Sequence, residues 1–121
     1  EKAPKAVPLT HANILSDHRG AEPPQKLVRA DAILGFLPMF HSFGLTIATL
    51  LPVLAGSKLV HHPDPTDAAA LARKLAAYKP TILLATPTFL GFILSRCKPG
   101  DLDSLRLVVV GAERCPDELF D

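Results

Sequence analysis

The sequence is poor in the residue types that identify several specialised classes of protein. It contains no tryptophan, one tyrosine and two cysteines among 121 residues. The cysteines, Cys97 and Cys115, stand far apart, which is the spacing of neither a zinc knuckle nor a disulfide framework. We therefore expect a protein of a reducing compartment, the cytoplasm.

Charge of one sign and long hydrophobic runs are also lacking. Thirteen basic residues oppose twelve acidic residues, so the net charge is +1. Because the charges are scattered, we expect no electrostatic binding of nucleic acid. The longest apolar run, residues 45–55, is too short to cross a bilayer and contains Pro52.

The chain does have an alternation of apolar runs and helix-like segments, with 48% hydrophobic residues to build a core. This alternation predicts an α/β fold, a parallel sheet with helices on both faces and right-handed crossovers. The predicted strands are 32–37, 57–61, 81–85 and 105–110, and the predicted helices are about 10–21, 45–55, 66–78, 87–97 and from 116 onward.

Local signals support several of these boundaries. Thr86-Pro87 is typical of a helix N-cap followed by proline in the first turn, and Gly56 is typical of a C-cap. The helix 45–55 is apolar on all sides, so we expect it to be buried on most of them. Pro52 within it should cost a backbone hydrogen bond or kink the helix.

Three segments follow predicted strands, namely 38–44, 86–88 and 111–115. In open parallel sheets, ligands bind beyond the carboxyl ends of the strands. We therefore expect His41, Thr86 and Gly111 to lie along one rim.

The residues of that rim leave their roles open. His41 could be a base, but Ser42 directly beside it in sequence is not the usual placement of a nucleophile, so a pocket-lining role is favoured. The turn after Val110 could let a flat ligand approach the backbone or could be an ordinary turn, and no dinucleotide fingerprint is present. The pair His61-His62 points to opposite faces of a strand end, which disfavours a metal site.

Four stretches together resemble the adenylate-forming (AMP-binding) superfamily of acyl-activating enzymes. They are, in order, PKAVPLTHANI, LPMFHSFGLT, YKPTILLATPTFL and VVVGAERCPDEL. They look like the end of the family's phosphate loop, a histidine motif of the acyl pocket, a strand with the start of a pocket helix, and the turn beside adenine. The nearest resemblance is to the acyl-[acyl-carrier-protein] synthetase part of 2-acylglycerophosphoethanolamine acyltransferase, followed by long-chain fatty acyl-CoA ligases.

The resemblance implies an enzyme that converts a fatty acid to acyl-AMP with ATP and Mg²⁺. The acyl group then passes to a thiol, either coenzyme A or the phosphopantetheine of an acyl carrier protein. It implies a cytoplasmic protein, with the inner membrane face as an alternative place for a full-length form. Residues 1–121 would be a partial AMP-binding N-terminal domain, truncated at both ends.

Roles carry over only to matching residues. The resemblance assigns ATP and phosphate binding to Lys5, Thr10 and His11. It assigns the acyl pocket to His41, Phe43, Gly44, Thr86, Thr88 and Phe89. It assigns adenine binding to Gly111, Ala112, Glu113 and Arg114. Under it, His41 is a binding and gating residue, and no catalytic or metal-binding residue falls within the chain.

The chain also departs from the family pattern. Lys2 and Ala6 stand where the family has loop glycines, which would alter the phosphate cradle. We expect the isolated chain to form no adenylate and to self-associate through open apolar surface. The alternatives are a small non-catalytic α/β module that binds a ligand or partner and, less favoured because a G-x-S-x-G elbow is missing, a hydrolase using His41.

Overall fold

The centre of the molecule is a four-stranded parallel sheet. The computed structural model describes residues 3–119, with the side chains of residues 21–25 left aside. The strands are β1 (Ala32–Gly35), β2 (Lys58–His61), β3 (Ile82–Ala85) and β4 (Leu107–Val110). They lie in the order β2-β1-β3-β4, and every pair is parallel. β1 and β3 are central and buried along their whole length, as continuous apolar runs predict.

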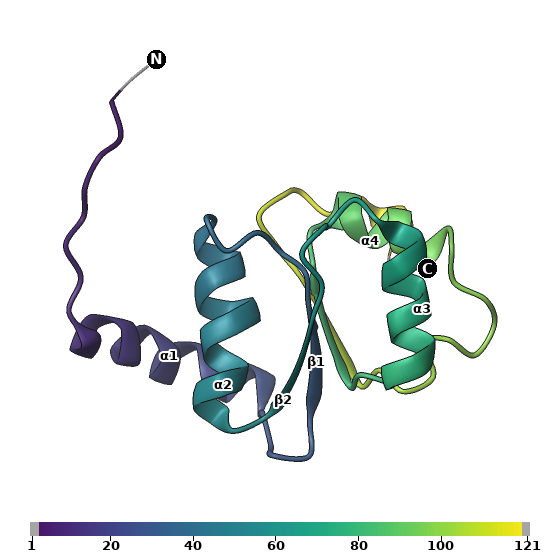
Figure 1. Ribbon diagram of the computed structural model, residues 1–121, viewed down its shortest axis with the longest axis horizontal. Helices are drawn as coiled ribbons and strands as arrows, with labels where there is room; N and C mark the ends of the chain where they lie inside the picture. The colour runs from purple at the N-terminus through teal and green to yellow at the C-terminus, as the bar shows by residue number, and fades with distance from the viewer. Residues whose placement is uncertain (1–2, 120–121) are drawn as a thin grey trace.

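Helices cover both faces of the sheet, as predicted (Figure 1). One face carries the π-helix η1 (Phe43–Leu50) and α2 (Leu51–Ala55), and the other carries α3 (Ala68–Tyr78) and α4 (Pro87–Leu94). The remaining elements are α1 (His11–Gln25), which packs on η1 and α2, and the 3₁₀ turn η2 (Asp117–Leu119). Within the described part of the chain, no helix is long and apolar enough to cross a membrane.

The path of the chain creates a switch point between the two central strands. From β1 the chain crosses over η1 and α2 to β2 on one side, whereas from β3 it crosses over α4 to β4 on the other. The segments that leave β1 and β3 therefore separate onto opposite faces of the sheet. Open α/β sheets bind their ligands in the crevice at such a point.

The apolar segment 45–55 differs from the helix expected there. Its first part is a π-helix, in which the Leu51 N–H donates to the carbonyl of Thr46. The change from π to α geometry comes directly before Pro52, whose missing N–H explains an irregular backbone at this place. Gly56 ends the helix in a left-handed conformation with φ of 71°, as its position predicted.

The expectation that this segment is buried on most sides was wrong. Gly44, Ala48, Leu51 and Pro52 are buried, but Val53 is 60% exposed. One side of the segment packs on the sheet and α1 contacts another part of it, so Val53 and Leu54 stay open to solvent despite the all-apolar composition.

Other boundaries differ by a few residues. Strand β1 ends at Gly35 instead of residue 37, and α4 ends at Leu94 instead of residue 97. The N-terminal helix continues to Gln25, and the helix expected from residue 116 is only the turn η2 up to residue 119. Thr86 and Asp67 cap α4 and α3, where side-chain oxygens accept from Phe89 N–H and Ala70 N–H.

Candidate functional site

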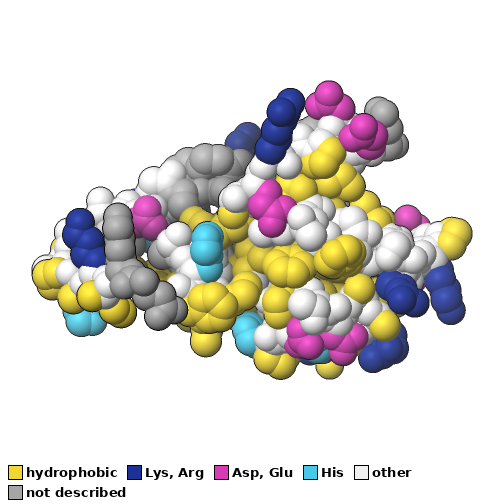
Figure 2. Space-filling view, turned by 90° about the horizontal axis from the view of Figure 1, so that it is seen from above, with side chains coloured by type: hydrophobic (Ala, Val, Ile, Leu, Met, Phe, Trp, Pro, Cys, Tyr) yellow, Lys and Arg dark blue, Asp and Glu magenta, His cyan; other side chains and the backbone are white. Residues whose placement is uncertain are grey.

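A cavity of about 230 Å³ lies at the switch point, where β1, β3 and β4 end. Figure 2 looks down on this edge and shows hydrophobic side chains gathered over its middle. Its lining comes from three segments that follow three strands: Leu37, Pro38, Phe40, His41 and Phe43 after β1, Thr86 and Phe89 after β3, and Ala112 and Glu113 after β4. The predicted rim of His41, Thr86 and the turn after β4 is confirmed as an arrangement in space.

The turn between β1 and η1 is tightly wound, and Gly44 makes it possible. A Cβ at Gly44 would lie 2.0 Å from the carbonyl oxygen of Pro38, so no other residue fits without moving the backbone. The His41 N–H donates to the same Pro38 carbonyl at 3.1 Å, and the Leu45 N–H donates to the His41 carbonyl at 3.0 Å. This winding brings His41 and Phe43 back over the end of β1.

The His41 ring is oriented by the backbone that follows it. Its Nδ1 accepts a hydrogen bond from the Phe43 N–H at 3.2 Å. In a neutral imidazole, an acceptor Nδ1 leaves the proton on Nε2, which is then a donor. This geometry suits a histidine that donates a hydrogen bond to a ligand oxygen at the cavity edge.

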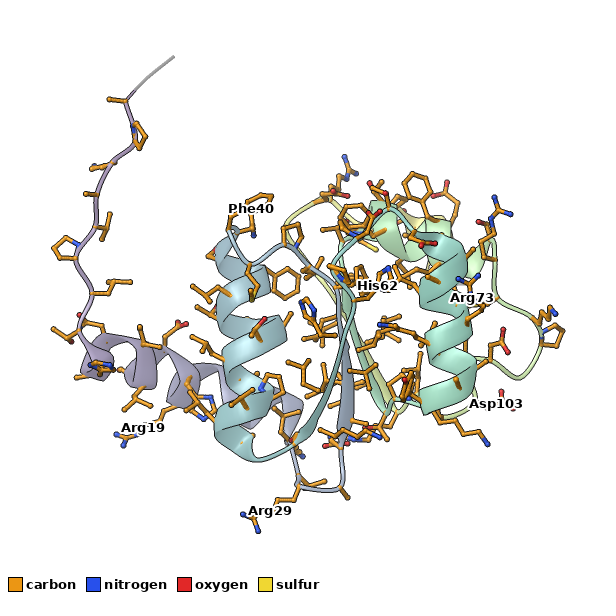
Figure 3. All side chains as sticks on the ribbon, in the orientation of Figure 1. Arg19, Arg29, Phe40, His62, Arg73 and Asp103 are labelled. Atoms are coloured by element: carbon orange, nitrogen blue, oxygen red, sulfur yellow. The ribbon has the colours of Figure 1, made fainter. Side chains whose placement is uncertain are left out.

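Aromatic rings form much of the cavity wall. Phe89 is fixed by an edge-to-face contact with the buried Phe36, with ring centroids 6.2 Å apart. Phe43 lies close to Gly111, since a Cβ on that glycine would be 3.5 Å from the ring. Phe40 differs from both, because it is 95% exposed and stands at the outer end of the β1–η1 loop (Figure 3).

The far wall of the cavity combines the first turn of α4 with the loop after β4. The Thr86 hydroxyl accepts from the Phe89 N–H at 3.3 Å, which caps the helix. The Glu113 carboxylate accepts from the Thr88 hydroxyl at 2.6 Å and from the Thr88 N–H at 3.2 Å. These hydrogen bonds to Thr88, the side-chain one first, lower the pKa of Glu113, with a smaller contribution from Thr86. Glu113 is therefore an ionised acceptor at neutral pH.

Ala112 adopts an unusual backbone conformation beside the cavity. Its φ is 68°, in the left-handed region that costs a residue with a Cβ about 1–2 kcal/mol. Such strain is found where surrounding contacts hold the chain in place, often at binding sites. Here it turns the chain sharply between Gly111 and Glu113, which places residue 112 in the cavity lining.

The structure brings together one set of the predicted site residues and leaves another set apart. His41, Phe43, Thr86, Phe89, Ala112 and Glu113 line the cavity, while Gly44, Thr88 and Gly111 support it. Arg114 is exposed and does not line the cavity.

The predicted phosphate-binding residues Lys5, Thr10 and His11 lie elsewhere. Lys5 is exposed on an extended segment that projects away from the sheet in Figure 1. Thr10 and Asn13 form reciprocal hydrogen bonds at the start of α1. Their assigned role stays a prediction, and Lys2 lies outside the described residues. None of these three described residues belongs to the cavity lining.

Metal ligation finds no support among the residues that the structure describes, where no three histidine, cysteine or acidic side chains cluster. His61 is exposed, and His62 is half-buried between β2 and α3, as Figure 3 shows. The Asp67 Oδ2 atom lies 4.0 Å from the His62 Nε2 atom.

Sequence reasoning missed the hydrogen bonds between Glu113 and Thr88 and two further features. Leu37, Pro38 and Phe40 line the cavity but were not assigned to it, although they belong to the motif that contains His41. The second feature is an ion pair at the opposite edge of the sheet, between Asp31 and Arg106. An acidic residue directly before one predicted strand and an arginine within another were its signal.

The sequence matches the profile of the AMP-binding enzyme family over residues 3–121. The chain belongs to the AMP-binding enzyme family. It is 33% identical over 119 residues to the acyl-CoA ligase sidI of Aspergillus fumigatus, covering 97% of this chain and 20% of the relative. It is 30% identical to a long-chain-fatty-acid–CoA ligase of Bacillus subtilis, covering 97% of this chain and 21% of the relative.

Solved structures agree with this placement. A Rhodopseudomonas palustris protein, provisionally assigned as a long-chain-fatty-acid CoA ligase, is 33% identical and has a TM-score of 0.73 over 83% of this chain and 25% of its own. The ATP-bound MatB of the same organism, at 24% identity, shares the fold with a TM-score of 0.74 over 86% of this chain and 20% of its own. The chain spans about a fifth of the length of the curated relatives that it matches.

Proposed function

We propose that this chain forms part of a ligase that activates a carboxylic acid with ATP and transfers its acyl group to a thiol. The observation that carries the proposal is the aromatic cavity at the switch point of a chain in the AMP-binding family. The cavity combines an apolar wall for an acyl group with an oriented histidine and a small-residue turn. Such a reaction needs no protein nucleophile with a protein base beside it, because the carboxylic acid and the thiol supply their own reacting groups.

The proposed reaction has two steps. A carboxylate oxygen attacks the α-phosphorus of ATP, the bond to pyrophosphate breaks, and a mixed anhydride of the acid with AMP forms. A thiol then attacks the acyl carbon, the thiol proton is lost to solvent, and AMP leaves. A protein accelerates such steps by holding the reactants in line and excluding water.

The residues of the cavity have the following proposed roles. His41 Nε2–H donates to an oxygen of the acyl carboxylate, and Phe43 and Phe89 contact the acyl group. Gly111 and Ala112 provide a wall without bulky side chains for the adenine ring. On the family resemblance alone, we propose that the ATP phosphates are bound by Lys5, Thr10 and His11. Mg²⁺ would neutralise the charge of these phosphates.

The acid is proposed to be a fatty acid, and the acceptor coenzyme A. The relatives described above are named as acyl-CoA ligases, one of them for long-chain fatty acids, which supports both choices. An acyl carrier protein is the second candidate acceptor, from the resemblance to the acyltransferase-linked synthetase. We further propose a cytoplasmic location. For the isolated chain, we propose self-association through the exposed side chains of Val53 and Leu54. We also propose that the isolated chain forms no adenylate, because it spans about a fifth of the length of its relatives.

The test is a calorimetric titration with dodecanoyl sulfamoyl adenosine, a non-hydrolysable acyl-adenylate analogue. We expect saturable binding that His41→Ala weakens about tenfold, the effect of one lost hydrogen bond to a charged ligand. His61→Ala is the matched control, because this exposed histidine lies outside the cavity lining. Absence of binding by a folded chain, or equal losses in both variants, would contradict the assignment of the cavity.

A further inference from the structure

The cavity wall formed by α4 and the loop after β4 is held together by hydrogen bonds that one side chain accepts. Glu113 Oε2 accepts from both the hydroxyl and the N–H of Thr88, at 2.6 and 3.2 Å. The Thr88 N–H is one of the first amides of α4, which have no partner within the helix. A carboxylate at this position satisfies that amide and interacts favourably with the helix dipole.

The loop that carries Glu113 is fixed on both sides of its left-handed residue. The Gly111 N–H donates to the carbonyl of Ala85, which extends the pairing of β3 with β4 by one residue. Ala112 then turns with φ of 68°, and Glu113 fastens the far side of the turn to Thr88. Ala112 is thus held between a strand and a helix, in the same cavity lining as Thr86 and Phe89.

The opposite wall of the cavity is built differently. After β1, the chain is shaped by its own turn at Gly44 and by packing of Phe43 near Gly111. Tight backbone contacts therefore fix the wall after β1, whereas the Glu113–Thr88 bridge fixes the wall formed by α4 and the loop after β4. Together they determine the separation of the two walls. A bridge of this kind can be removed without creating a buried void, because Thr88 and Glu113 are both exposed.

We propose that Glu113 is a positioning and specificity-determining residue, which sets the width of the acyl cavity by tying the loop after β4 to Thr88 at the start of α4. This inference rests on the proposed function, because it takes the cavity as the acyl site. With the bridge in place, Ala112, where the adenine wall meets the acyl cavity, stays in the same lining as Phe89, and the cavity accepts compact acyl groups. Without it, the loop moves outward and longer acyl groups gain affinity relative to short ones.

The test compares two probes, octanoyl and tetradecanoyl sulfamoyl adenosine, by calorimetric titration of the chain and its variants. Glu113→Ala should change the ratio of their dissociation constants by about tenfold in favour of the longer probe, the discrimination that one methylene group gives in a fitted pocket. Thr88→Val removes the hydroxyl hydrogen bond but keeps the N–H of residue 88, so it should cause a smaller change in the same direction. The double variant should match Glu113→Ala, since Glu113→Ala alone already removes both hydrogen bonds. Glu113→Gln and Thr88→Ser keep an acceptor and a donor, so both should retain the original ratio.

Asp103→Ala is the matched control, since it removes an exposed carboxylate remote from the cavity (Figure 3). If Glu113→Ala weakens both probes equally and leaves the ratio unchanged, Glu113 is only structural and the inference is overturned while the proposed function stands. If the unsubstituted chain is folded but binds neither probe, the proposed function and the inference are overturned together.

Discussion

The two edges of the sheet are built on opposite principles. At the amino edge, the Asp31 side chain is 3% exposed and both of its carboxylate oxygens accept hydrogen bonds. Its carboxylate accepts from Arg106 Nε at 2.8 Å, from the Thr81 hydroxyl at 2.7 Å and from the Val28 N–H at 2.9 Å. At the carboxyl edge, the chain instead leaves a cavity, a left-handed alanine and a fully exposed phenylalanine.

The amino edge joins strands that are distant in sequence. Asp31 precedes β1, Thr81 precedes β3 and Arg106 precedes β4, so one carboxylate binds residues before three strands. The Thr81 N–H also donates to the Ala32 carbonyl at 2.7 Å. A satisfied network of this kind fixes strand register and contributes stability. The contrast teaches that this chain keeps its buried ion pair away from the edge where a ligand would bind, and four predictions test that separation.

The largest effect on stability is expected from Asp31→Ala. This change leaves the Val28 N–H and the Thr81 hydroxyl without their acceptor and removes the charge-assisted hydrogen bonds to Arg106, so the free energy of unfolding should fall by about 2–3 kcal/mol. Urea denaturation followed by circular dichroism measures it. Asp17→Ala, which removes an exposed carboxylate on α1, should leave the midpoint nearly unchanged. Equal changes in the free energy of unfolding of the two variants would show that the Asp31 network contributes no more stability than an exposed carboxylate does.

The same ion pair predicts how stability depends on pH. The Arg106 guanidinium, with the Thr81 hydroxyl and the Val28 N–H, holds the pKa of Asp31 well below its usual range, against the opposing effect of burial. A carboxyl group whose pKa is lowered by folding stabilises the native state above its unfolded pKa of about 4, and this contribution is lost as the pH falls below that value. Asp31→Asn lacks the ionisation. The difference in free energy of unfolding between the unsubstituted protein and Asp31→Asn should therefore be constant from pH 7 to about 5 and become smaller below about pH 4. A gap that stays constant down to pH 2 would contradict the assignment.

The sequence predicted the amino edge and the carboxyl edge unequally. Strand positions, the Thr86 N-cap and the shared rim of His41 and Thr86 follow from local apolar runs and from one rule of parallel sheets, so they were confirmed. The Asp31–Arg106 pair joins residues 75 positions apart, and no local pattern says that two particular charges meet. The bridge from Glu113 to Thr88 was missed for the same reason, although both residues were placed at the site.

The backbone irregularities show a second limit. Pro52 indicated an irregular helix, but the choice of a π-helix depends on how η1 packs on β1, where a Cβ at Gly35 would lie 2.7 Å from the Ala48 carbonyl. The exposure of Phe40 could not be predicted either, since apolar residues of the same motif divide between the two environments: Leu37 is buried, whereas Met39 and Leu45 are exposed. Such details depend on tertiary contacts that override local preference.

At the carboxyl edge, Phe40→Ala should separate binding from stability. Because Phe40 is 95% exposed, its removal should change the free energy of unfolding by less than about 0.5 kcal/mol. Its ring lines the cavity, so affinity for dodecanoyl sulfamoyl adenosine should fall about tenfold through lost apolar contact. Met39→Ala is the matched control, because Met39 is also exposed and adjacent but does not line this cavity. Similar affinity losses in both variants would mean that the whole loop, and not the ring, contributes to binding.

The smallest effect is expected from exchanging the residues at two left-handed positions. Ala112→Gly removes a steric cost of about 1–2 kcal/mol but adds up to about 1 kcal/mol of unfolded-chain entropy, so stability should rise by a few tenths to 1 kcal/mol. Gly56→Ala makes the opposite exchange at a φ of 71°, where the helix C-cap needs the left-handed conformation, and should lower stability by about 1 kcal/mol. Thermal unfolding of both variants measures the two signs together. If Ala112→Gly is also destabilising, the alanine side chain makes a favourable contact with the cavity wall that outweighs its backbone strain, and the carboxyl edge is better packed than its open cavity suggests.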